Sequence, residues 1–211
     1  MKLNPAHKQT AREGFKRKCL FVLIEGYRSM KKKGKYSTSW EEEDLTAQLI
    51  YFMKINPKIF QWKLDIVPEY RLYSDDTFFK NGNAKKAPRI DFRFSKWHSK
   101  QQFEYFIEAK NLCDSNWFKE DGTKVNSSYQ LNRFINKGLM HFISGHYPNN
   151  GCLCGYVLQG EPNKIIEKLN NLLINKSLNR LELGKPINNL DSIYDFQNQE
   201  LVLTSVFLDF R

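Results

Sequence analysis

The sequence lacks the features that mark membrane, secreted and disulfide-stabilised proteins. No window approaches the roughly 18 uninterrupted apolar residues of a membrane-spanning helix, and no apolar segment of the signal-peptide kind follows Met1. Cysteine is sparse: Cys19, Cys113, Cys152 and Cys154 are scattered along the chain and are expected to be reduced thiols. These absences predict a cytoplasmic protein without a membrane partner.

Other absences narrow the function. The chain has no Gly-rich phosphate-binding loop, which argues against an ATPase or a dinucleotide-dependent enzyme. It has no internal repeat and no low-complexity segment. Its 211 residues, of which 41% are hydrophobic and 14% aromatic, suffice for a sizeable core and exclude wholesale disorder. We therefore expect a single domain over residues 1–211.

Arginine is also scarce, although the chain is strongly basic. Only 9 of its 33 basic residues are Arg, and with 23 acidic residues the formal net charge is +10. An excess of this size favours polyanions as partners, because Lys and Arg contacts to phosphate release counterions. An excess made mostly of lysine also simply keeps a surface solvated. Six lysines in two runs are candidate nucleic-acid contacts or solvated faces: Lys31, Lys32, Lys33, Lys35, Lys85 and Lys86.

Hydrophobic periodicity predicts both helices and strands. The predicted helices cover residues 5–33, 39–56, 127–146 and a segment that begins at 161–162, and the predicted strands cover 64–73, 89–94, 102–112, 152–158 and 201–210. Pro68 predicts that the first strand is bulged or at an edge. The polar stretch 74–87 is typical of a long loop. This order predicts a mixed α/β fold, in which helices pack on the faces of a mixed sheet.

Two short segments carry the chemistry: residues 88–91 (Pro-Arg-Ile-Asp) and residues 107–110 (Ile-Glu-Ala-Lys). Both lie in predicted strands that a short polar turn joins into a hairpin. If the turn is centred near Ser99, residues whose numbers sum to about 199 lie opposite one another, which puts Asp91 and Glu108 roughly 5 Å apart at Cβ.

Two carboxylates at that separation repel each other unless a cation lies between them. Hard oxygen ligands suit Mg²⁺ or Mn²⁺, so Asp91 and Glu108 predict a metal site. Lys110 shares the face of Glu108, where it could orient or deprotonate an attacking water and stabilise charge on a phosphate. The alternative is a surface salt-bridge cluster, in which Arg89, Arg93 and Lys110 neutralise the two acids without a metal. Helices on both faces of the sheet would bury these charges and make an unpaired cluster costly, which disfavours that alternative.

Together, the Asp that ends segment 88–91 and the Glu-Ala-Lys motif at 108–110 resemble the signature of the PD-(D/E)xK nucleases, the restriction-endonuclease-like superfamily. The resemblance covers about residues 39–159, where the predicted order of a helix, three strands, a helix and a strand is the family's common core. The N-terminal helical extension, about residues 1–36, and the segment of about residues 160–211 are then additions. The Pro and Asp are not adjacent here, a variation that the superfamily tolerates.

The resemblance implies a metal-dependent nuclease that hydrolyses phosphodiester bonds, more in DNA than in RNA, with Mg²⁺ or Mn²⁺ as cofactor. The family often has a metal-facing Glu on its first core helix. Glu42 is the choice here, because it lies on the core-facing stripe of Leu45 and Leu49. Glu43 is the second choice and Glu41 is also a candidate. The alternative is that these acidic residues serve only the helix dipole in the first turn, which holds for at least two of the three whatever the function.

The predicted helix at 127–146 resembles one that sends a Gln or a basic side chain toward the site in several such nucleases. Gln130 is therefore a candidate catalytic residue and Arg133 a candidate contact to nucleic acid. The proposed catalytic set is Asp91, Glu108, Lys110 and Gln130, and the proposed metal ligands are Glu42, Asp91 and Glu108.

Several alternatives stay open. A non-cleaving nucleic-acid-binding or scaffold subunit would keep the fold without the reaction. A nuclease subunit of a larger restriction, antiviral defence or repair assembly would need partners, and double-strand cutting by a small subunit favours a homodimer. His141, His146, Cys152 and Cys154 have a loose zinc-like spacing, but buried reduced thiols in a core strand are the preferred interpretation.

Overall fold

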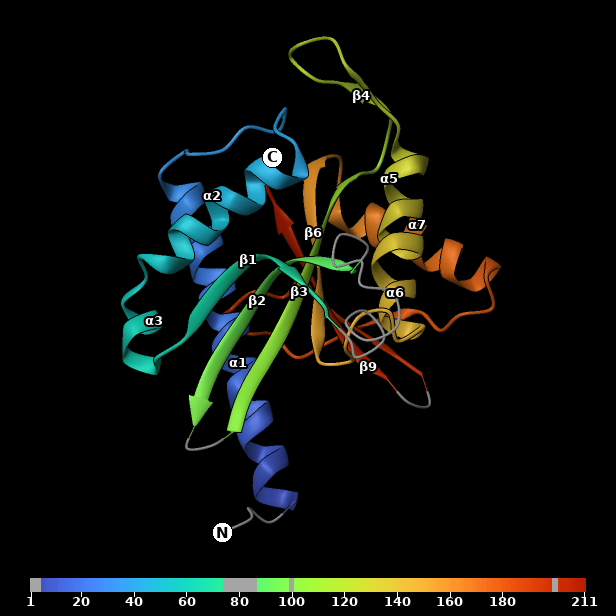
Figure 1. The fold of residues 1–211 in the computed structure, drawn as a ribbon. Coiled ribbons are helices and arrows are strands. Elements are labelled where there is room, and N and C mark those ends of the chain that lie inside the picture. Colours follow the sequence, from blue (N-terminus) through green and yellow to red (C-terminus); the bar gives the residue numbers. More distant parts are fainter. Residues whose placement is uncertain (1–4, 74–86, 99–100, 199–200) are drawn as a thin grey trace.

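The computed structural model describes residues 5–73, 87–98, 101–198 and 201–211. Its fold is mixed α/β, with a seven-stranded mixed sheet flanked by helices (Figure 1). The sheet consists of β1 (Asp65–Arg71), β2 (Arg89–His98), β3 (Gln101–Cys113), β6 (Gly151–Gln159), β7 (Leu181–Leu183), β8 (Ile193–Gln197) and β9 (Val202–Asp209). The helices are α1 (Pro5–Lys32), α2 (Glu42–Lys54), α3 (Pro57–Trp62), α5 (Ser127–Arg133), the π-helical segment η2 (Phe134–Leu139), α6 (Met140–Ile143) and α7 (Pro162–Asn175).

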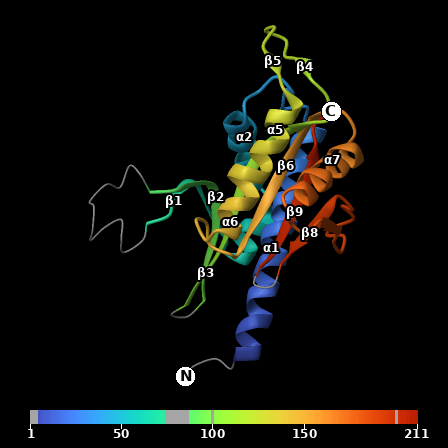
Figure 2. The same ribbon diagram turned by 90° about the vertical axis from the view of Figure 1, so that its right-hand side faces the viewer.

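The strand order in the sheet is β1-β2-β3-β6-β9-β8-β7. The three central strands β3, β6 and β9 pair in parallel, whereas the strands on either side of them pair antiparallel. A separate two-stranded hairpin, β4 (Trp117–Phe118) and β5 (Lys124–Val125), projects from the body between β3 and α5 (Figures 1 and 2). The mixed sheet confirms the predicted fold class.

Helices cover both faces of the sheet (Figure 2). Each face has its own apolar core. Helices α1, α2 and α3 pack on one face, and α5, η2, α6 and α7 pack on the other. Because side chains alternate along a strand, β3 contributes Ile107 and Ala109 to the first core and Phe106 to the second. Glu108 and Lys110 are thus charged residues at buried positions of β3, between apolar neighbours that belong to the first core.

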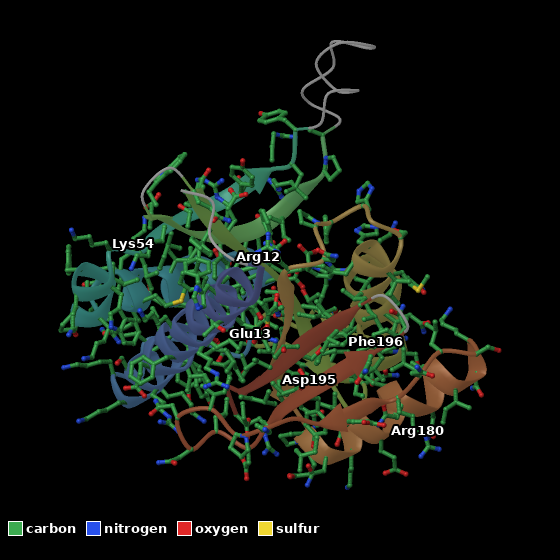
Figure 3. All side chains as sticks on the ribbon, turned by 90° about the horizontal axis from the view of Figure 1, so that it is seen from below. Arg12, Glu13, Lys54, Arg180, Asp195 and Phe196 are labelled. Carbon is green, nitrogen blue, oxygen red and sulfur yellow. The ribbon has the colours of Figure 1, made fainter. Side chains whose placement is uncertain are left out.

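Helix α1 has a central place in the first core. Leu20, Val22, Leu23 and Ile24 are all fully buried, so the helix is covered well beyond a single apolar stripe. Figure 3 shows α1 lying between α2 and α3 on one side and β8 and β9 on the other. The sequence predicted this helix as an N-terminal addition to the αβββαβ core. The structure places it inside the first apolar core, a position that hydrophobic periodicity alone does not predict.

The β2–β3 hairpin has the predicted register. Phe92 pairs with Ile107 and His98 with Gln101, so the numbers of paired residues sum to 199 as predicted, and Asp91 comes directly before the first paired residue of β2. Ser99, the predicted centre of the turn, lies outside the described residues.

Strand β1 is at the edge of the sheet, as Pro68 predicted. Its pairing with β2 skips Glu69, which has a φ of 46°, and this irregularity lies opposite Asp91. Ile90 joins the second core, although Phe92 joins the first and simple alternation predicts both on one face. Local irregularities of this kind re-aim side chains next to functional sites.

The sequence did not predict the short elements, because segments of two to six residues are too short to show hydrophobic periodicity. They are α3, β4, β5, β7 and β8. The helix predicted over 127–146 ends at Ile143 and is interrupted by the π-helical turns of η2. The predicted loop at 74–87 lies, except for Ala87, outside the described residues. In the described part of the chain, no helix combines the length and apolarity that a membrane crossing requires.

Two glycines of α1 give a matched test of the close contact between α1 and α2. A Cβ on Gly26 would lie 2.5 Å from Met53 Cγ and 3.2 Å from the Met53 backbone nitrogen, whereas a Cβ on Gly14 meets no atom within 4 Å. We expect Gly26→Ala to lower the free energy of unfolding by about 1–3 kcal/mol through overpacking. Gly14→Ala should raise it by about 0.5–1 kcal/mol, because Ala restricts the unfolded chain. Urea denaturation measures both, and equal stabilisation by the two changes would contradict the close contact.

Candidate active site

Four charged side chains from three elements meet at one place. Glu42 comes from the first turn of α2, Asp91 from β2, and Glu108 and Lys110 from β3. The Lys110 ammonium nitrogen lies 2.7 Å from Glu108 Oε1, 3.0 Å from Glu42 Oε1 and 4.0 Å from Asp91 Oδ2. The Lys110 and Glu108 side chains are only 5% and 7% exposed. The structure therefore gathers three carboxylates around a single buried ammonium.

Backbone amides of β3 aim two of these carboxylates. The Ala109 amide donates to Asp91 Oδ2 at 2.6 Å, and the Asn111 amide donates to Glu42 Oε2 at 3.0 Å. The Thr46 hydroxyl donates to the Glu42 backbone carbonyl at 2.8 Å and lies 3.0 Å from the hydroxyl of the fully buried Tyr156. The carboxylates are thus oriented by the fold rather than only by the charge they surround.

Arg133 of α5 brings a second cation to the rim of the cluster. Its guanidinium lies 3.4 Å from Glu42 Oε1, and its side chain is 33% exposed. Its central carbon also lies 6.0 Å from the ring centroid of Tyr129, an exposed residue of the same helix. Because α2 and α5 cover opposite faces of the sheet, this contact joins the two helical layers at the site.

Burial and mutual charge shift the titration of the cluster. Burial, followed by the charge of Asp91, raises the pKa of Glu108 to about 8, although Lys110 opposes the shift. Burial also raises the pKa of Asp91, against the effect of Lys110 and the Ala109 amide. For Lys110, burial disfavours the charged form, but Glu108, Glu42 and Asp91 outweigh it and raise its pKa. The Lys110 side chain therefore keeps its positive charge within the cluster.

The donor set fits a hard cation chemically. Glu108 Oε2 is buried and has no hydrogen-bond partner among the described residues, so one oxygen of the cluster remains available. Carboxylate oxygens are the ligands that Mg²⁺ and Mn²⁺ prefer. Among the residues with a described position, no three Asp, Glu, His or Cys side chains already form a metal-holding group. A metal would therefore have to share or take over the position that the Lys110 ammonium fills.

Of the three cations in the salt-bridge alternative (Arg89, Arg93 and Lys110), only Lys110 pairs with Asp91 and Glu108. Arg89 pairs with Glu43 at 3.1 Å and with Glu69 at 3.3 Å, away from the cluster. Arg93 pairs with Glu104. Neither arginine neutralises Asp91 or Glu108 by an ion pair, so Lys110 does so from within the cluster.

The three candidate glutamates of α2 have different partners. Only Glu42 reaches the cluster, which agrees with its predicted place on the core-facing stripe. Glu41 pairs with Lys119, next to the β4–β5 hairpin, and Glu43 pairs with Arg89.

Gln130 lies beside the cluster rather than in it. It lines a cavity of about 20 Å³ together with Asn111 and Trp117, among other residues. Gln130 Oε1, Asn111 Oδ1 and Trp117 Nε1 are all buried without a partner. Asn111 follows Lys110 in β3, and its backbone amide donates to Glu42. Gln130 therefore adjoins the cluster through the cavity that it shares with Asn111.

The predicted nucleic-acid contacts fall into separate groups. The Lys31 ammonium donates to the backbone carbonyls of Asp209 at 2.7 Å and Arg211 at 3.2 Å, which gives it a structural role. Lys32, the last residue of α1, and Lys33 and Lys35, which follow the helix, are exposed. Lys85 and Lys86 lie outside the described residues.

The four residues with zinc-like spacing are divided between two faces of the sheet. Cys152 and Cys154 are buried in the core on the α1 side. The rings of His141 and His146, 4.6 Å apart, both contact Tyr147, which belongs to the other core. This arrangement agrees with the preferred interpretation of buried thiols.

Tyr147 is a neighbour of the site that the sequence did not reveal. Its hydroxyl donates to the Arg89 carbonyl at 3.1 Å. Burial, followed by the charges of Glu108 and Asp91, raises the pKa of Tyr147, which shows that it lies close to both carboxylates. It follows a helix end at a turn, where no periodic pattern or motif marks it.

Removal of the Lys110 charge tests how far the cluster depends on it. We expect Lys110→Met, measured in EDTA, to lower the free energy of unfolding by about 3–5 kcal/mol, because it leaves buried carboxylates unpaired. Lys176→Met, at an exposed lysine after α7, is the matched control and should change the value by less than about 0.5 kcal/mol. Equal urea midpoints for the two variants would mean that the ammonium is not needed.

Comparisons with models of protein families, with curated proteins and with solved structures returned no match. The interpretation of the site therefore depends on the chain's own residues. These are the Glu-Ala-Lys motif at 108–110, the opposed Asp91 and the helix-borne Glu42, which the fold brings around one point.

Proposed function

We propose that the chain is a metal-dependent nuclease with a restriction-endonuclease-like core of the PD-(D/E)xK type, which hydrolyses phosphodiester bonds, preferentially in DNA. The observation that carries the proposal is the meeting of Glu42, Asp91 and Glu108 around the Lys110 ammonium. The element order supports it: α2, the strands β1 to β3, α5 and β6 come in the order of a helix, three strands, a helix and a strand, with the short α3 inserted after α2 and the β4–β5 hairpin inserted before α5. The formal net charge of +10 also suits a polyanionic substrate.

In this proposal Glu42, Asp91 and Glu108 hold Mg²⁺ or Mn²⁺. The free, buried Glu108 Oε2 and the all-oxygen donor set support this choice of ion. When bound, the metal would supply Lewis-acid stabilisation of the phosphate and would lower the pKa of the attacking water. The divalent charge would also replace Lys110 as the charge that balances the three carboxylates.

The displaced ammonium then has a chemical role. Lys110 is within 4.0 Å of all three carboxylates, so it remains close enough to orient the attacking water and to donate to a phosphate oxygen. Arg133, partly exposed at the rim, can donate to another phosphate oxygen. The water oxygen bonds to phosphorus while the ester oxygen leaves and takes up a proton, which yields a phosphate monoester and a hydroxyl end.

A non-cleaving nucleic-acid-binding or scaffold subunit is the second candidate. The observation that favours it is that Lys110 already neutralises the cluster without a metal. A nuclease that acts only as a homodimer, or in a restriction, defence or repair assembly, would likewise not cleave DNA as an isolated chain. It would cleave DNA once its partner is added.

Cleavage assays test the proposed reaction. We expect the chain to cut single-stranded or duplex DNA with Mg²⁺ or Mn²⁺, and Asp91→Asn, Glu42→Gln and Lys110→Met each to reduce the rate at least about 100-fold. Glu41→Gln is the matched control for Glu42→Gln, because Glu41 is one residue away, exposed and paired with Lys119. RNA of the same sequence tests the preference for DNA. Cleavage by Asp91→Asn and Lys110→Met at the rate of the unchanged chain would reject the mechanism.

Metal titration separates the nuclease from the scaffold. Because the Lys110 charge repels a cation at the same point, we expect Lys110→Met to bind Mn²⁺ about tenfold more tightly than the unchanged chain, although it loses cleavage. Asp91→Asn should bind Mn²⁺ more weakly. Isothermal titration calorimetry on variants whose fold is checked by circular dichroism gives both values. Unchanged or weaker binding by Lys110→Met, or no Mn²⁺ binding at all, would favour the scaffold.

A further inference from the structure

The aromatic ring of Tyr129 lies exposed beside the carboxylate cluster. Tyr129 is on α5 and is 63% exposed. Its ring centroid lies 6.0 Å from the guanidinium carbon of Arg133, and the Arg133 guanidinium lies 3.4 Å from Glu42 Oε1. Two contacts therefore join this ring to a proposed metal ligand.

Packing does not account for the ring of Tyr129. In the described part of the chain, it belongs to neither apolar core and contacts no other aromatic ring. The Tyr129 backbone amide donates to Asn126 Oδ1 at 2.9 Å, which caps α5 without using the ring. Single exposed apolar side chains are common on protein surfaces, but this one adjoins an arginine of the cluster. The ring is therefore free to contact a ligand.

Hydrogen bonds hold the first turn of α5 against the strand that carries the site. The Ser127 hydroxyl donates to the backbone carbonyl of Cys113, at the end of β3, at 2.8 Å. The Ser127 amide donates to Asn116 Oδ1 at 2.9 Å. Figure 2 shows α5 directly below the β4–β5 hairpin, in front of the sheet. Because this turn is already ordered, binding at Tyr129 costs little further ordering of the backbone.

An unpaired nucleotide matches a ring next to an arginine. Each phosphate of a nucleic acid adjoins a nucleoside, so a strand whose phosphate meets Arg133 brings a base close to Tyr129. Aromatic side chains bind bases by stacking on their flat faces, and such contacts tolerate any base sequence. Inside a duplex, both faces of a base are stacked on neighbouring bases, and the base must leave the stack before a side chain can reach it. The pair of Tyr129 and Arg133 therefore favours a single strand.

We propose that the site takes a single-stranded segment of its substrate, and that Tyr129 stacks on the base next to the phosphate that Arg133 contacts. Tyr129 is then a substrate-binding residue that determines specificity, because it discriminates against fully paired DNA. The inference rests on the proposed function for the reaction. The stacking contact itself requires only that a nucleic-acid strand binds at this site.

Fluorescence anisotropy in EDTA measures the contact without hydrolysis. The probes are a fluorescein-labelled 20-nucleotide DNA strand of mixed sequence and the same strand annealed to its complement. Tyr129→Ala should bind the single strand at least about fivefold more weakly, and the duplex within about twofold of the unchanged chain. Tyr129→Phe keeps the ring and should bind both probes within about twofold. Full single-strand affinity of Tyr129→Ala, or an equal loss on both probes, would overturn the proposal.

Tyr51→Ala is the matched control. Tyr51 is also an exposed tyrosine of a helix, 56% exposed on α2. It is nine residues after Glu42, which corresponds to about 14 Å along the helix axis. Its loss should therefore leave single-strand affinity within about twofold. A loss as large as that of Tyr129→Ala would show binding over the general surface and would overturn the site.

A strand of abasic spacers separates stacking from an effect of the ring on Arg133. If Tyr129 binds a base, the abasic strand should bind the unchanged chain at least about fivefold more weakly than the normal strand. Tyr129→Ala should then weaken binding of the abasic strand by no more than about twofold, because ring and base act as one contact. Losses that multiply independently would mean that the ring only orients the Arg133 guanidinium, which contradicts the proposal.

Cleavage distinguishes this inference from the proposed function. With Mg²⁺ or Mn²⁺, we expect the unchanged chain to cut the single strand at least about fivefold faster than the duplex at a low substrate concentration, and Tyr129→Ala to lose most of that preference. A chain that cuts neither probe, while Tyr129→Ala still loses single-strand affinity, would reject the nuclease and keep the stacking contact. Equal cutting of both probes, with an unchanged KM in Tyr129→Ala, would keep the nuclease and overturn the contact.

Discussion

One ammonium group holds together parts of the chain that are far apart in sequence. Lys110 attracts carboxylates from α2, β2 and its own strand, and Arg133 reaches the same Glu42 from the opposite helical layer. Buried charges of this kind cost free energy unless they are paired and hydrogen-bonded, and the amides of β3 supply the hydrogen bonds. The C-terminal part of β3 is therefore the point where the helical layers on both faces of the sheet are linked.

Local rules predicted the centre of this site from the sequence. The alternation of β3 and the length of the hairpin turn predicted the register of β2 and β3, and Asp91 and Glu108 do meet at the same lysine. The spacing of Glu42 from Leu45 and Leu49 selected it among three glutamates, and only Glu42 reaches the cluster. Tyr147 could not be found this way, because its approach to Glu108 depends on the packing of a turn against a distant strand.

Charge is where sequence and structure differ most. The lysines at the end of α1 were predicted as candidate contacts to nucleic acid, but Lys31 donates to backbone carbonyls near the end of β9. Net charge predicted a polyanion partner in general, while the positions of the positive charges are set by tertiary packing.

The position of β9 has a consequence for how the chain folds during synthesis. This strand lies between β6 and β8, although about forty residues separate it from β6 in sequence. Until residues 202–209 have left the ribosome, β6 presents an unpaired hydrogen-bonding edge beside an exposed apolar face. The central parallel pairing of β6 with β9 therefore forms only after α7, β7 and β8 have been synthesised, and the carboxylate cluster on β3 lies in a complete sheet only when β9 inserts.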